Sequence, residues 1–279
     1  MKKKILILLL LISSICLAQK ETIELPEGKE EIEFSNNYIT ALFDVFLDKN
    51  GTVYVKDSLV NYNQLGNLAF KFVHEHPMHK YNVLAFLHID VNTPYKFVDK
   101  VKVQLRQSYM RFFYRTGNIN NLEQGIWYYG NLPTFLKREV DKVDSSKINL
   151  VSYKYSDYLN PELYESYLDN LYAKRFKKSD SVLNKMKYKK IEFLKNDSIS
   201  INKVRISHNN VKRIYEEIKN EDICFVLYQP NLLYKDYIKN ILVLREIGLL
   251  RKNNNKQNPF IFPISGSLQT VLDQEKIKF

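Results

Sequence analysis

The sequence is short of the residues on which several kinds of catalytic and redox site depend. Of its 279 residues, 8 are glycine, 8 are proline and 2 are cysteine. It contains no phosphate-cradling glycine-rich loop, no G-x-S-x-G nucleophile motif and no H-E-x-x-H zinc motif. Cys16 lies in the N-terminal apolar segment, so Cys224, inside the apolar run ICFVL, stands alone in the chain that follows. We therefore expect no enzymatic activity, no cofactor and no internal disulfide.

Long apolar runs are also missing. The N-terminal apolar segment, residues 5–18, is shorter than the ~20 residues that a spanning helix needs. Lysines precede it and the small residue Ala18 closes it, which predicts a signal peptide over residues 1–18, cleaved before Gln19. We expect the mature chain in the periplasm or cell envelope. The alternative is a retained single-span anchor in the inner membrane.

The chain has an excess of positive charge, with 42 Lys and Arg against 31 Asp and Glu, for a net charge of +11. The charge is spread along the sequence, which is typical of a solvated basic surface. The sharper interpretation is attraction to an anionic partner such as cell-wall polymer or a membrane surface. No zinc-finger spacing and no aromatic RNA-binding motif is present, so we expect no nucleic-acid partner.

An internal repeat is the strongest signal in the sequence. Residues 84–106 match residues 223–245 at an offset of 139, with identities that include Phe86 and Phe225 and also Arg106 and Arg245. Residues 45–68 match residues 191–214 at a second constant offset, 146. The extra residues of the first copy fall in one loop between the two blocks. Register kept on both sides of a single length change is what a duplicated domain should show.

Each copy is predicted to have the element order ββαβαβ, so the fold class is α+β with two such domains. In the first copy we expect strands at 40–47, 52–55, 83–89 and 110–115, with helices from Asn61 or Asn63 to 75 and over 94–108. The first two strands join through Asp48-Lys49-Asn50-Gly51, where Asn50 and Gly51 readily take positive φ. The predicted parts are a lead-in at 19–37, a first domain at 38–117, a helical, tyrosine-rich connector at 118–185 and a second domain at 186–279. The connector helix begins at Asn160-Pro161 and runs to about 177, and residues 260–264 form a closing edge strand.

The junction between strand and helix in the first copy resembles the periplasmic domain of the ExbD/TolR family of biopolymer-transport proteins. Ile89-Asp90 is followed by Tyr95 and by a helix with Val98, Val101 and Leu105 on one face. The lead-in Glu24-Leu25-Pro26 and the hairpin turn at 48–51 also fit, and the second copy is a weaker match in which Gln229 replaces the Asp. The resemblance implies a role with a TonB/Tol-type transmembrane transport system. Family members carry a proton-relaying Asp in a membrane helix, and residues 5–18 have no acidic residue, so that role has no candidate here.

The candidate binding residues lie at the two strand–helix junctions: Asp90, Asn92, Tyr95, Asn231 and Tyr234. Asp90 would contact a partner peptide or a cell-wall group. The structural alternative, which we favour, is a carboxylate that accepts backbone N–H groups at a helix N-terminus. For the two tyrosines we favour buried rings with surface hydroxyls.

His74, His76 and His79 form the best metal-like cluster in the sequence. On a strand, His74 and His76 would share one face. The alternative, which we favour, is an exposed polar helix end, so no metal is assigned.

We expect a cell-envelope component or accessory of a TonB/Tol-type system that acts by protein binding, through an open sheet edge to which a partner adds a strand. Its partners would be envelope proteins of that system or peptidoglycan, and homodimerisation is left open. One alternative is a secreted structural protein that binds the cell wall. The other is a secreted enzyme with a pocket built by the connector.

Overall fold

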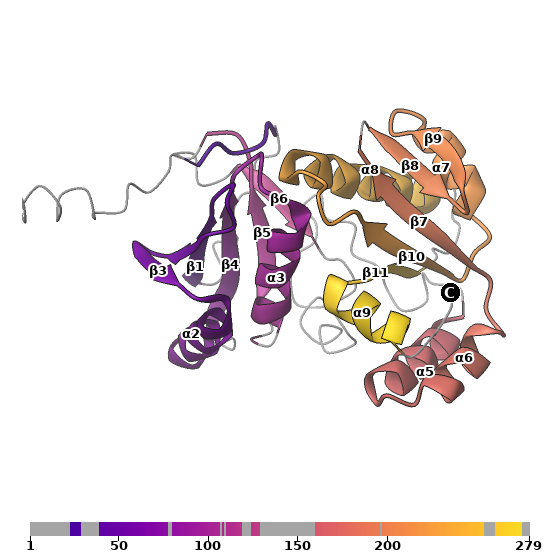
Figure 1. Cartoon of the computed structure of the whole chain (residues 1–279), viewed down its shortest axis with the longest axis horizontal. Helices are drawn as coiled ribbons and strands as arrows, with labels where there is room; N and C mark the ends of the chain where they lie inside the picture. Colours follow the sequence, from indigo (N-terminus) through magenta and orange to yellow (C-terminus); the bar gives the residue numbers. More distant parts are fainter. Residues whose placement is uncertain are drawn as a thin grey trace, which may run out of the picture.

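Two mixed β-sheets and seven helices make up the part of the chain that the computed structural model describes (Figure 1). The described residues are 23–28, 39–77, 80–106, 108, 110–118, 124–128, 160–195, 197–253 and 260–274. The α+β class expected from the sequence is confirmed. The predicted signal peptide lies outside the described residues. Within them, no helix is long and apolar enough to cross a membrane.

The first sheet has the strand order β3-β2-β1-β4-β5-β6. Its central pairs, β1–β4 and β4–β5, are parallel, and the remaining pairs are antiparallel. Helices α2 and α3 contact each other in the same half of the molecule. The elements are β1 (Ile39–Leu47), β2 (Val53–Val55), β3 (Ser58–Val60), α2 (Tyr62–Glu75), β4 (Tyr81–Ile89), α3 (Tyr95–Arg106), β5 (Arg111–Arg115) and β6 (Gly125–Tyr128).

The second sheet has the order β11-β10-β7-β8-β9, with β11–β10 and β10–β7 parallel. Residues 260–264 were predicted as an edge strand, and residues 260–263 form β11 at one edge of this sheet. The elements are α5 (Pro161–Tyr172), α6 (Phe176–Leu183), β7 (Tyr188–Leu194), β8 (Ser198–Ile201), β9 (Val204–Ser207), α7 (Val211–Ile218), β10 (Ile223–Tyr228), α8 (Tyr234–Asn253), β11 (Phe260–Pro263) and α9 (Gly266–Gln274).

The strand registers of the two sheets follow the internal repeat residue by residue. Val45 pairs with Val55 in the first sheet, and Ile191 pairs with Ile201 in the second, which are the positions that the upstream repeat aligns. Across the parallel pair, Leu47 lies opposite Ile89, and the equivalent Phe193 lies opposite Tyr228. The parallel edges agree too, because Leu84 pairs with Arg111 and Ile223 pairs with Phe260. The repeat read from the sequence is therefore a repeat of strand pairing.

The expected order ββαβαβ is wrong by one strand in each copy. β3 follows β2 after a tight turn at Lys56, which has φ 56°, and β9 follows β8 in the same way. Each added strand is only three or four residues long and mostly exposed, so no alternation long enough to signal a strand exists in the sequence. The order in each copy is βββαβαβ.

The hairpin turn after β1 also differs from the prediction. Positive φ occurs at Gly51 (86°) and not at Asn50. Asp48 Oδ1 accepts the backbone N–H groups of Asn50 (2.9 Å) and Thr52 (2.7 Å), and Gly51 N donates to Asp48 O at 3.0 Å. This is a three-residue loop in which the glycine takes the left-handed position. A Cβ on Gly51 would lie 2.5 Å from Cδ1 of Phe97, so glycine is required there for space as well.

The described parts of the segment 118–185, which was expected to be a helical connector, belong to both halves of the molecule. β6 pairs antiparallel with β5 and extends the first sheet. α5 packs on the second sheet, where the ring of Tyr167 lies 5.8 Å from that of Phe225. The helix begins at Pro161 as predicted but ends at Tyr172, because Lys174 turns into the left-handed region at φ 56°.

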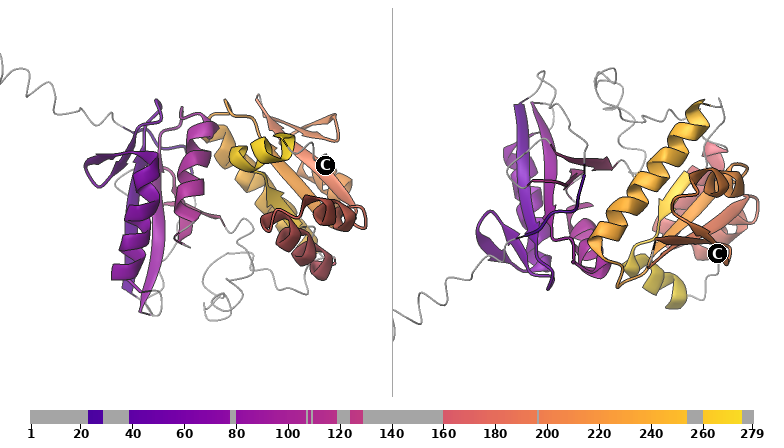
Figure 2. Two further views of the ribbon diagram at one scale, coloured as in Figure 1. Left: turned by 60° about the horizontal axis from the view of Figure 1, so that its bottom comes forward. Right: turned by 90° about the horizontal axis from the view of Figure 1, so that it is seen from above.

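One apolar core runs through both repeats, and a second one lies between α5, α6, α9 and the other face of the second sheet. α3 and α8 contact each other and lie between the two sheets (Figure 2). The repeats are thus joined by a shared interior, and any site between them is held on packed elements.

Candidate functional site

The two repeats contact each other along a seam, and equivalent residues of the two repeats make equivalent contacts there. Four backbone hydrogen bonds form two reciprocal pairs, in which equivalent N–H groups of the two repeats bond equivalent carbonyls of the opposite repeat. The bonds run from Tyr95 N to Leu232 O (2.7 Å), from Tyr234 N to Thr93 O (2.8 Å), from Lys96 N to Pro230 O (2.9 Å) and from Lys235 N to Val91 O (3.2 Å). The equivalent residues Pro94 and Leu233 bridge each other at the centre. The seam is therefore a local pseudo-two-fold contact.

A buried lysine lies behind this seam among tyrosines. Lys102 of α3 is 2% exposed, and its Nζ donates to the hydroxyl of Tyr237 on α8 at 2.8 Å. The same hydroxyl lies 3.1 Å from that of Tyr114 on β5. Lys102 Nζ also lies 4.9 Å from the ring centroid of Tyr237 and 5.6 Å from that of Tyr95. Both repeats thus contribute to the environment of one amine.

This environment changes the acid–base behaviour of the lysine. Burial, aided by the nearby positive charge of Arg106, lowers the pKa of Lys102 from 10.5 to about 7, against the opposing effect of Asp99. Burial also raises the pKa of the Tyr234 phenol, with Tyr114 adding to the shift. The neutral form of each group is favoured in the folded protein.

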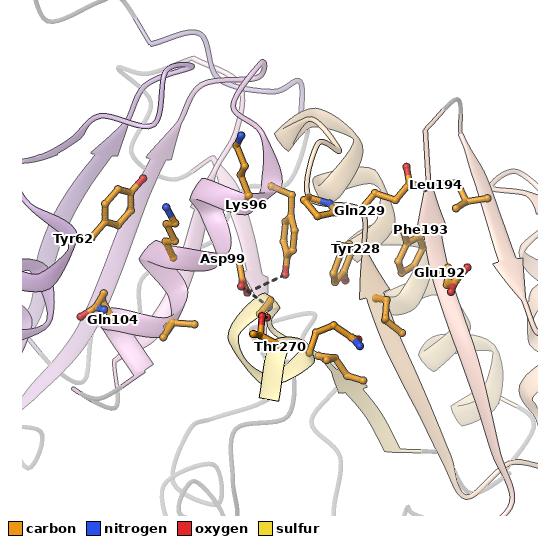
Figure 3. A pocket seen from close by; sticks show the side chains of 18 of the residues that line it. Tyr62, Lys96, Asp99, Gln104, Glu192, Phe193, Leu194, Tyr228, Gln229 and Thr270 are labelled. Atoms are coloured by element: carbon orange, nitrogen blue, oxygen red, sulfur yellow. Dashed lines mark hydrogen bonds between the residues drawn. The ribbon is translucent and has the colours of Figure 1, made fainter. Parts of the chain in front are cut away.

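A cleft of about 840 Å³ opens beside the seam, between α3 of the first repeat and the carboxyl ends of β7 and β10 of the second (Figure 3). Aromatic side chains from both repeats line it: Tyr62, Tyr95, Phe193 and Tyr228. Helix α9 supplies Gly266, Gln269 and Thr270. The volume is within the usual range for ligand sites, which combine apolar walls with a few placed polar groups.

The polar groups of the cleft are distributed unevenly. Asp99 is buried, and its Oδ2 accepts the backbone N–H of Gly266 at 2.8 Å, while Tyr95 Oη lies 3.5 Å from Oδ1. Glu192 pairs with Lys190, which lies outside the cleft, at 3.2 Å. Lys96 and Lys100 are exposed on α3 at the cleft, and neither forms an ion pair with another described residue. The charged groups that line the cleft are thus two exposed lysines and two carboxylates, of which Asp99 is buried and Glu192 is already paired with Lys190.

Asp90 is buried within the chain. Its carboxylate accepts the backbone N–H of Glu24 at 3.1 Å and that of Asn92 at 2.9 Å. These are backbone donors of the kind that the structural alternative requires. The side chain of Asn92 is exposed beside it, and Asn231 is exposed at the equivalent position of the other repeat.

Tyr95 and Tyr234, the other predicted binding residues, lie on the seam. Both are buried, Tyr95 at 4% exposure and Tyr234 at 0%. Tyr95 lines the cleft, where its ring packs on those of Tyr228 (4.7 Å) and Tyr237 (4.9 Å). The expectation of a surface hydroxyl is wrong for Tyr234, whose hydroxyl is buried and has no hydrogen-bond partner among the described residues. Both tyrosines therefore lie at the seam between the repeats. Asp90 does not share a site with them.

The histidine cluster falls at the end of helix α2 and not on a strand. His74 is exposed in the last turn, whereas His76 is half-buried, with Nδ1 2.9 Å from Phe72 O. His79 lies outside the described residues. Among the residues that the structure does describe, no group of three or more His, Cys, Asp or Glu side chains could hold a metal ion.

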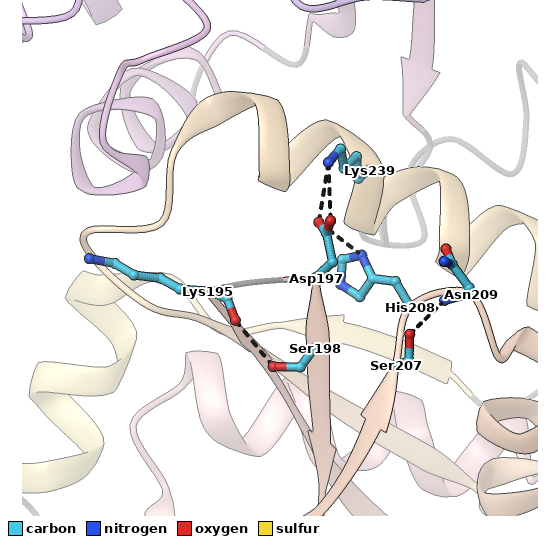
Figure 4. Close-up of polar contacts among 7 residues, drawn as sticks. All are labelled: Lys195, Asp197, Ser198, Ser207, His208, Asn209 and Lys239. Carbon is cyan, nitrogen blue, oxygen red and sulfur yellow. Dashed lines mark hydrogen bonds and ion pairs between the residues drawn. The ribbon is translucent and has the colours of Figure 1, made fainter.

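A second polar cluster joins β9 to α8 (Figure 4). His208 is 5% exposed, with Nδ1 4.0 Å from Asp197 Oδ1, and Asp197 also pairs with Lys239 at 3.2 Å. Burial lowers the pKa of His208, although Asp197 opposes the shift. The repeat equivalents of His208 and Asp197 are Tyr62 and Gly51, and Tyr62 Oη donates to Gly51 O at 2.8 Å. Both pairs tie a helix start to a hairpin turn, which assigns the histidine a structural role.

Sequence reasoning singled out Tyr95 but missed the other residues that line the cleft. Lys96, Asp99 and Lys100 were visible only as the polar side of a helix, and Gln229 only as the replacement for Asp90. The contribution of α9 had no signal, since its Gly266 meets Asp99 from far along the chain. The one usable sign was the repeat itself, because equivalent surfaces of a duplicated domain tend to pair.

Comparison of the chain with protein-family models, with curated proteins and with solved structures gave no match.

Proposed function

We propose that the protein is an envelope component or accessory of a TonB/Tol-type transport system, resembling the ExbD/TolR family, and that it acts by binding a partner protein in the cleft between its repeats. The cleft carries the proposal. It is preformed on packed elements, it has aromatic walls, and it presents Lys96 and Lys100, which have no ion-pair partner among the residues that the structure describes. Clefts between structural units are a preferred location for binding sites.

The cleft is favoured over the sheet edges as the place of binding. β3 and β9 are the outer strands next to the hairpins, and they are only three and four residues long. Short edge strands are one of the devices by which proteins discourage strand addition. Leu59 on β3 and Val204 on β9 are exposed. Neither of them lines the cleft.

The residues that carry the ExbD/TolR resemblance lie at one junction between a strand and a helix. Ile89 ends β4, Asp90 follows it, and Tyr95 opens α3, whose Val98, Val101 and Leu105 are buried in the core. The order in each repeat, with one strand more than expected, still places this junction at the seam. In the proposed role the junction positions the two repeats and the cleft meets the partner.

Site-specific photo-crosslinking in intact cells tests the proposal. A photoreactive amino acid replaces Gln229, which is exposed and lines the cleft, or Lys235, which is exposed on the same repeat and does not line the cleft. We expect an adduct with a protein of the envelope fraction from position 229 and none from position 235. The substitution Thr270→Trp, which fills the cleft, should abolish that adduct.

Other outcomes reject the proposal. Adducts of equal yield from both positions would assign binding to a different surface. Salt-sensitive sedimentation with peptidoglycan, unaffected by Thr270→Trp, would favour a wall-binding structural protein. Recovery of the chain in the cytoplasmic fraction with an intact N-terminus would exclude the envelope role.

A further inference from the structure

An extended segment of the chain already lies on the first repeat, at the ends of its parallel strands. In residues 23–28, Glu24 N donates to Asp90 Oδ2 at 3.1 Å, and Glu24 O accepts from Val91 N at 2.8 Å. Further along, Pro26 O accepts from Gly117 N at 2.8 Å. The alternate side chains of Ile23 and Leu25 are buried, and Glu24 is exposed. The first repeat thus shows how an extended peptide is held.

The same location on the second repeat is open. Strand registers make Gln229 the equivalent of Asp90, Pro230 that of Val91, and Gly266 that of Gly117. Gln229, Pro230 and Gly266 all line the cleft. The groove that holds residues 23–28 on one repeat is therefore part of the cleft on the other.

We infer that the cleft binds an extended, acidic segment of a partner protein, laid across the ends of β10 and β11 as residues 23–28 lie across the ends of β4 and β5. This inference rests on the proposed binding function and names its ligand class. A segment with apolar side chains at alternate positions would face the aromatic wall, as Ile23 and Leu25 face the first repeat.

The differences between the two grooves define the chemistry of the ligand. Pro230 has no N–H, so the backbone bond that Val91 makes has no counterpart. Gly266 N is already taken by Asp99 Oδ2. Neither backbone N–H that holds residues 23–28 is therefore available on the second repeat, and side chains must provide the contacts with the ligand. Gln229 is free to bond a peptide group, and Gln269 Oε1 has no hydrogen-bond partner among the described residues.

Charge decides between neutral and acidic ligands. Lys96 and Lys100 stand on α3 along the open side of the cleft, without ion-pair partners in the described part of the chain. Carboxylates on the ligand, like those of Glu24 and Glu27 in the segment of the first repeat, would face them. Such rim charges contribute chiefly to the rate and specificity of association.

Fluorescence anisotropy with the full mature chain tests the inference. The probe is a labelled peptide of residues 20–29, KETIELPEGK, and its control has all three glutamates replaced by glutamine. We expect saturable binding of the acidic peptide, weakened about tenfold by Lys96→Glu with Lys100→Glu and by the glutamine control. The matched variant Lys235→Glu, at the repeat equivalent of Lys96, should leave the dissociation constant unchanged. Thermal melting verifies that each variant is folded.

The opposite results overturn the inference. Absence of binding, or binding that persists undiminished in Thr270→Trp, would exclude the cleft as a peptide site. Concentration-dependent self-association that Thr270→Trp abolishes would assign the cleft to a second copy of this chain. If the peptide fails while crosslinking from position 229 succeeds, the ligand class is wrong and the binding function stands. If the peptide binds while crosslinking fails, the cleft is a peptide site without the proposed envelope partner.

Discussion

Lys102 is the residue whose chemistry is most altered by the meeting of the two repeats. The folded chain holds this proton only up to about pH 7, whereas the unfolded chain holds it up to about pH 10.5. The unfolded state therefore binds more protons between those values, and stability rises with pH across that window. Below about pH 7 the full cost of burying the charged amine is present.

Lys102→Met should therefore stabilise the protein at neutral pH. The methionine keeps the apolar stem and removes the amine, and replacing a buried charge by an apolar group of similar volume gains about 1–4 kcal/mol in favourable cases. Chemical denaturation at pH 7 and pH 9 measures the free energy of unfolding, and the gain should be smaller at pH 9. Lys100→Met, on the exposed side of the same helix, is the control. A loss of stability at pH 7 would mean that the bond to Tyr237 outweighs the burial cost.

His208 makes stability depend on pH over a lower pH range than Lys102 does. Its pKa is lowered below 6.5 by burial, so stability is present above that pH and falls as the pH decreases through it. His208→Tyr installs the residue found at the equivalent position, Tyr62, and should flatten thermal stability between pH 5 and pH 8. His74→Gln, which changes an exposed histidine, should retain the wild-type profile. Identical profiles for wild type and His208→Tyr would contradict the assignment.

Asp90 and Gln229 occupy one repeat position with different tasks. Asp90→Ala leaves two backbone N–H groups without their acceptor and frees residues 23–28, which should cost about 1–3 kcal/mol. Gln229→Ala removes an exposed side chain and should change the free energy of unfolding by less than about 0.5 kcal/mol while weakening peptide binding. Denaturation measures the effect of each substitution on stability, and fluorescence anisotropy measures its effect on peptide binding. If Asp90→Ala weakened peptide binding without any loss of stability, Asp90 would be a ligand contact and not a structural residue.

At the residue scale, the sequence predicted positions better than roles. Tyr95 and Tyr234 were found from the repeat, but their burial on a shared seam requires knowing that the two copies face each other. The lowered pKa of Lys102 has no sequence signal, because it sits at a helical position that reads as a solvated lysine until Tyr237 is placed above it.

At the scale of single elements, helix α8 offers two tyrosines whose hydroxyl groups should contribute differently to stability. Tyr237→Phe removes the oxygen that accepts from Lys102 and lies against Tyr114, so we expect a cost of about 1–3 kcal/mol. Tyr234→Phe removes a buried hydroxyl with no hydrogen-bond partner in the described part of the chain, and should be neutral or stabilising. The two free energies of unfolding, measured side by side at pH 7, check the seam. Equal costs would show that the hydroxyl network does not hold the repeats together.

The elements that the sequence predicted well are those with long periodic patterns. α2 is capped by Asn61, one of its two candidates, with Asn61 and Gln64 forming a capping box. β4 and α3 lie within two residues of their expected bounds, because burial of one face fixes their pattern. β3, β6 and β9 were missed, since three or four residues carry too little alternation, and α9 was missed as a short helix at the end of the chain.

For the whole molecule, two repeats with equivalent strand pairing meet at a local pseudo-two-fold contact, and the two repeats are unequal. One groove is filled by residues 23–28 and its equivalent is part of an open cleft. This inequality could not be predicted from the repeat, which reports likeness between the copies. It arises from residues outside the repeat, namely the lead-in on one side and α9 with Gly266 on the other.

The most direct measurement is the location of the bound peptide. A peptide of residues 20–29 with a photoreactive benzoylphenylalanine in place of Leu25 is irradiated with the full mature chain, and the adduct is mapped by mass spectrometry. We expect crosslinks within residues 227–230 and 264–270, the walls of the cleft on the second repeat. Crosslinks confined to residues 90–91 and 116–117, where the peptide would have displaced the chain's own segment, or scattered over the basic surface, would contradict the assignment of the cleft.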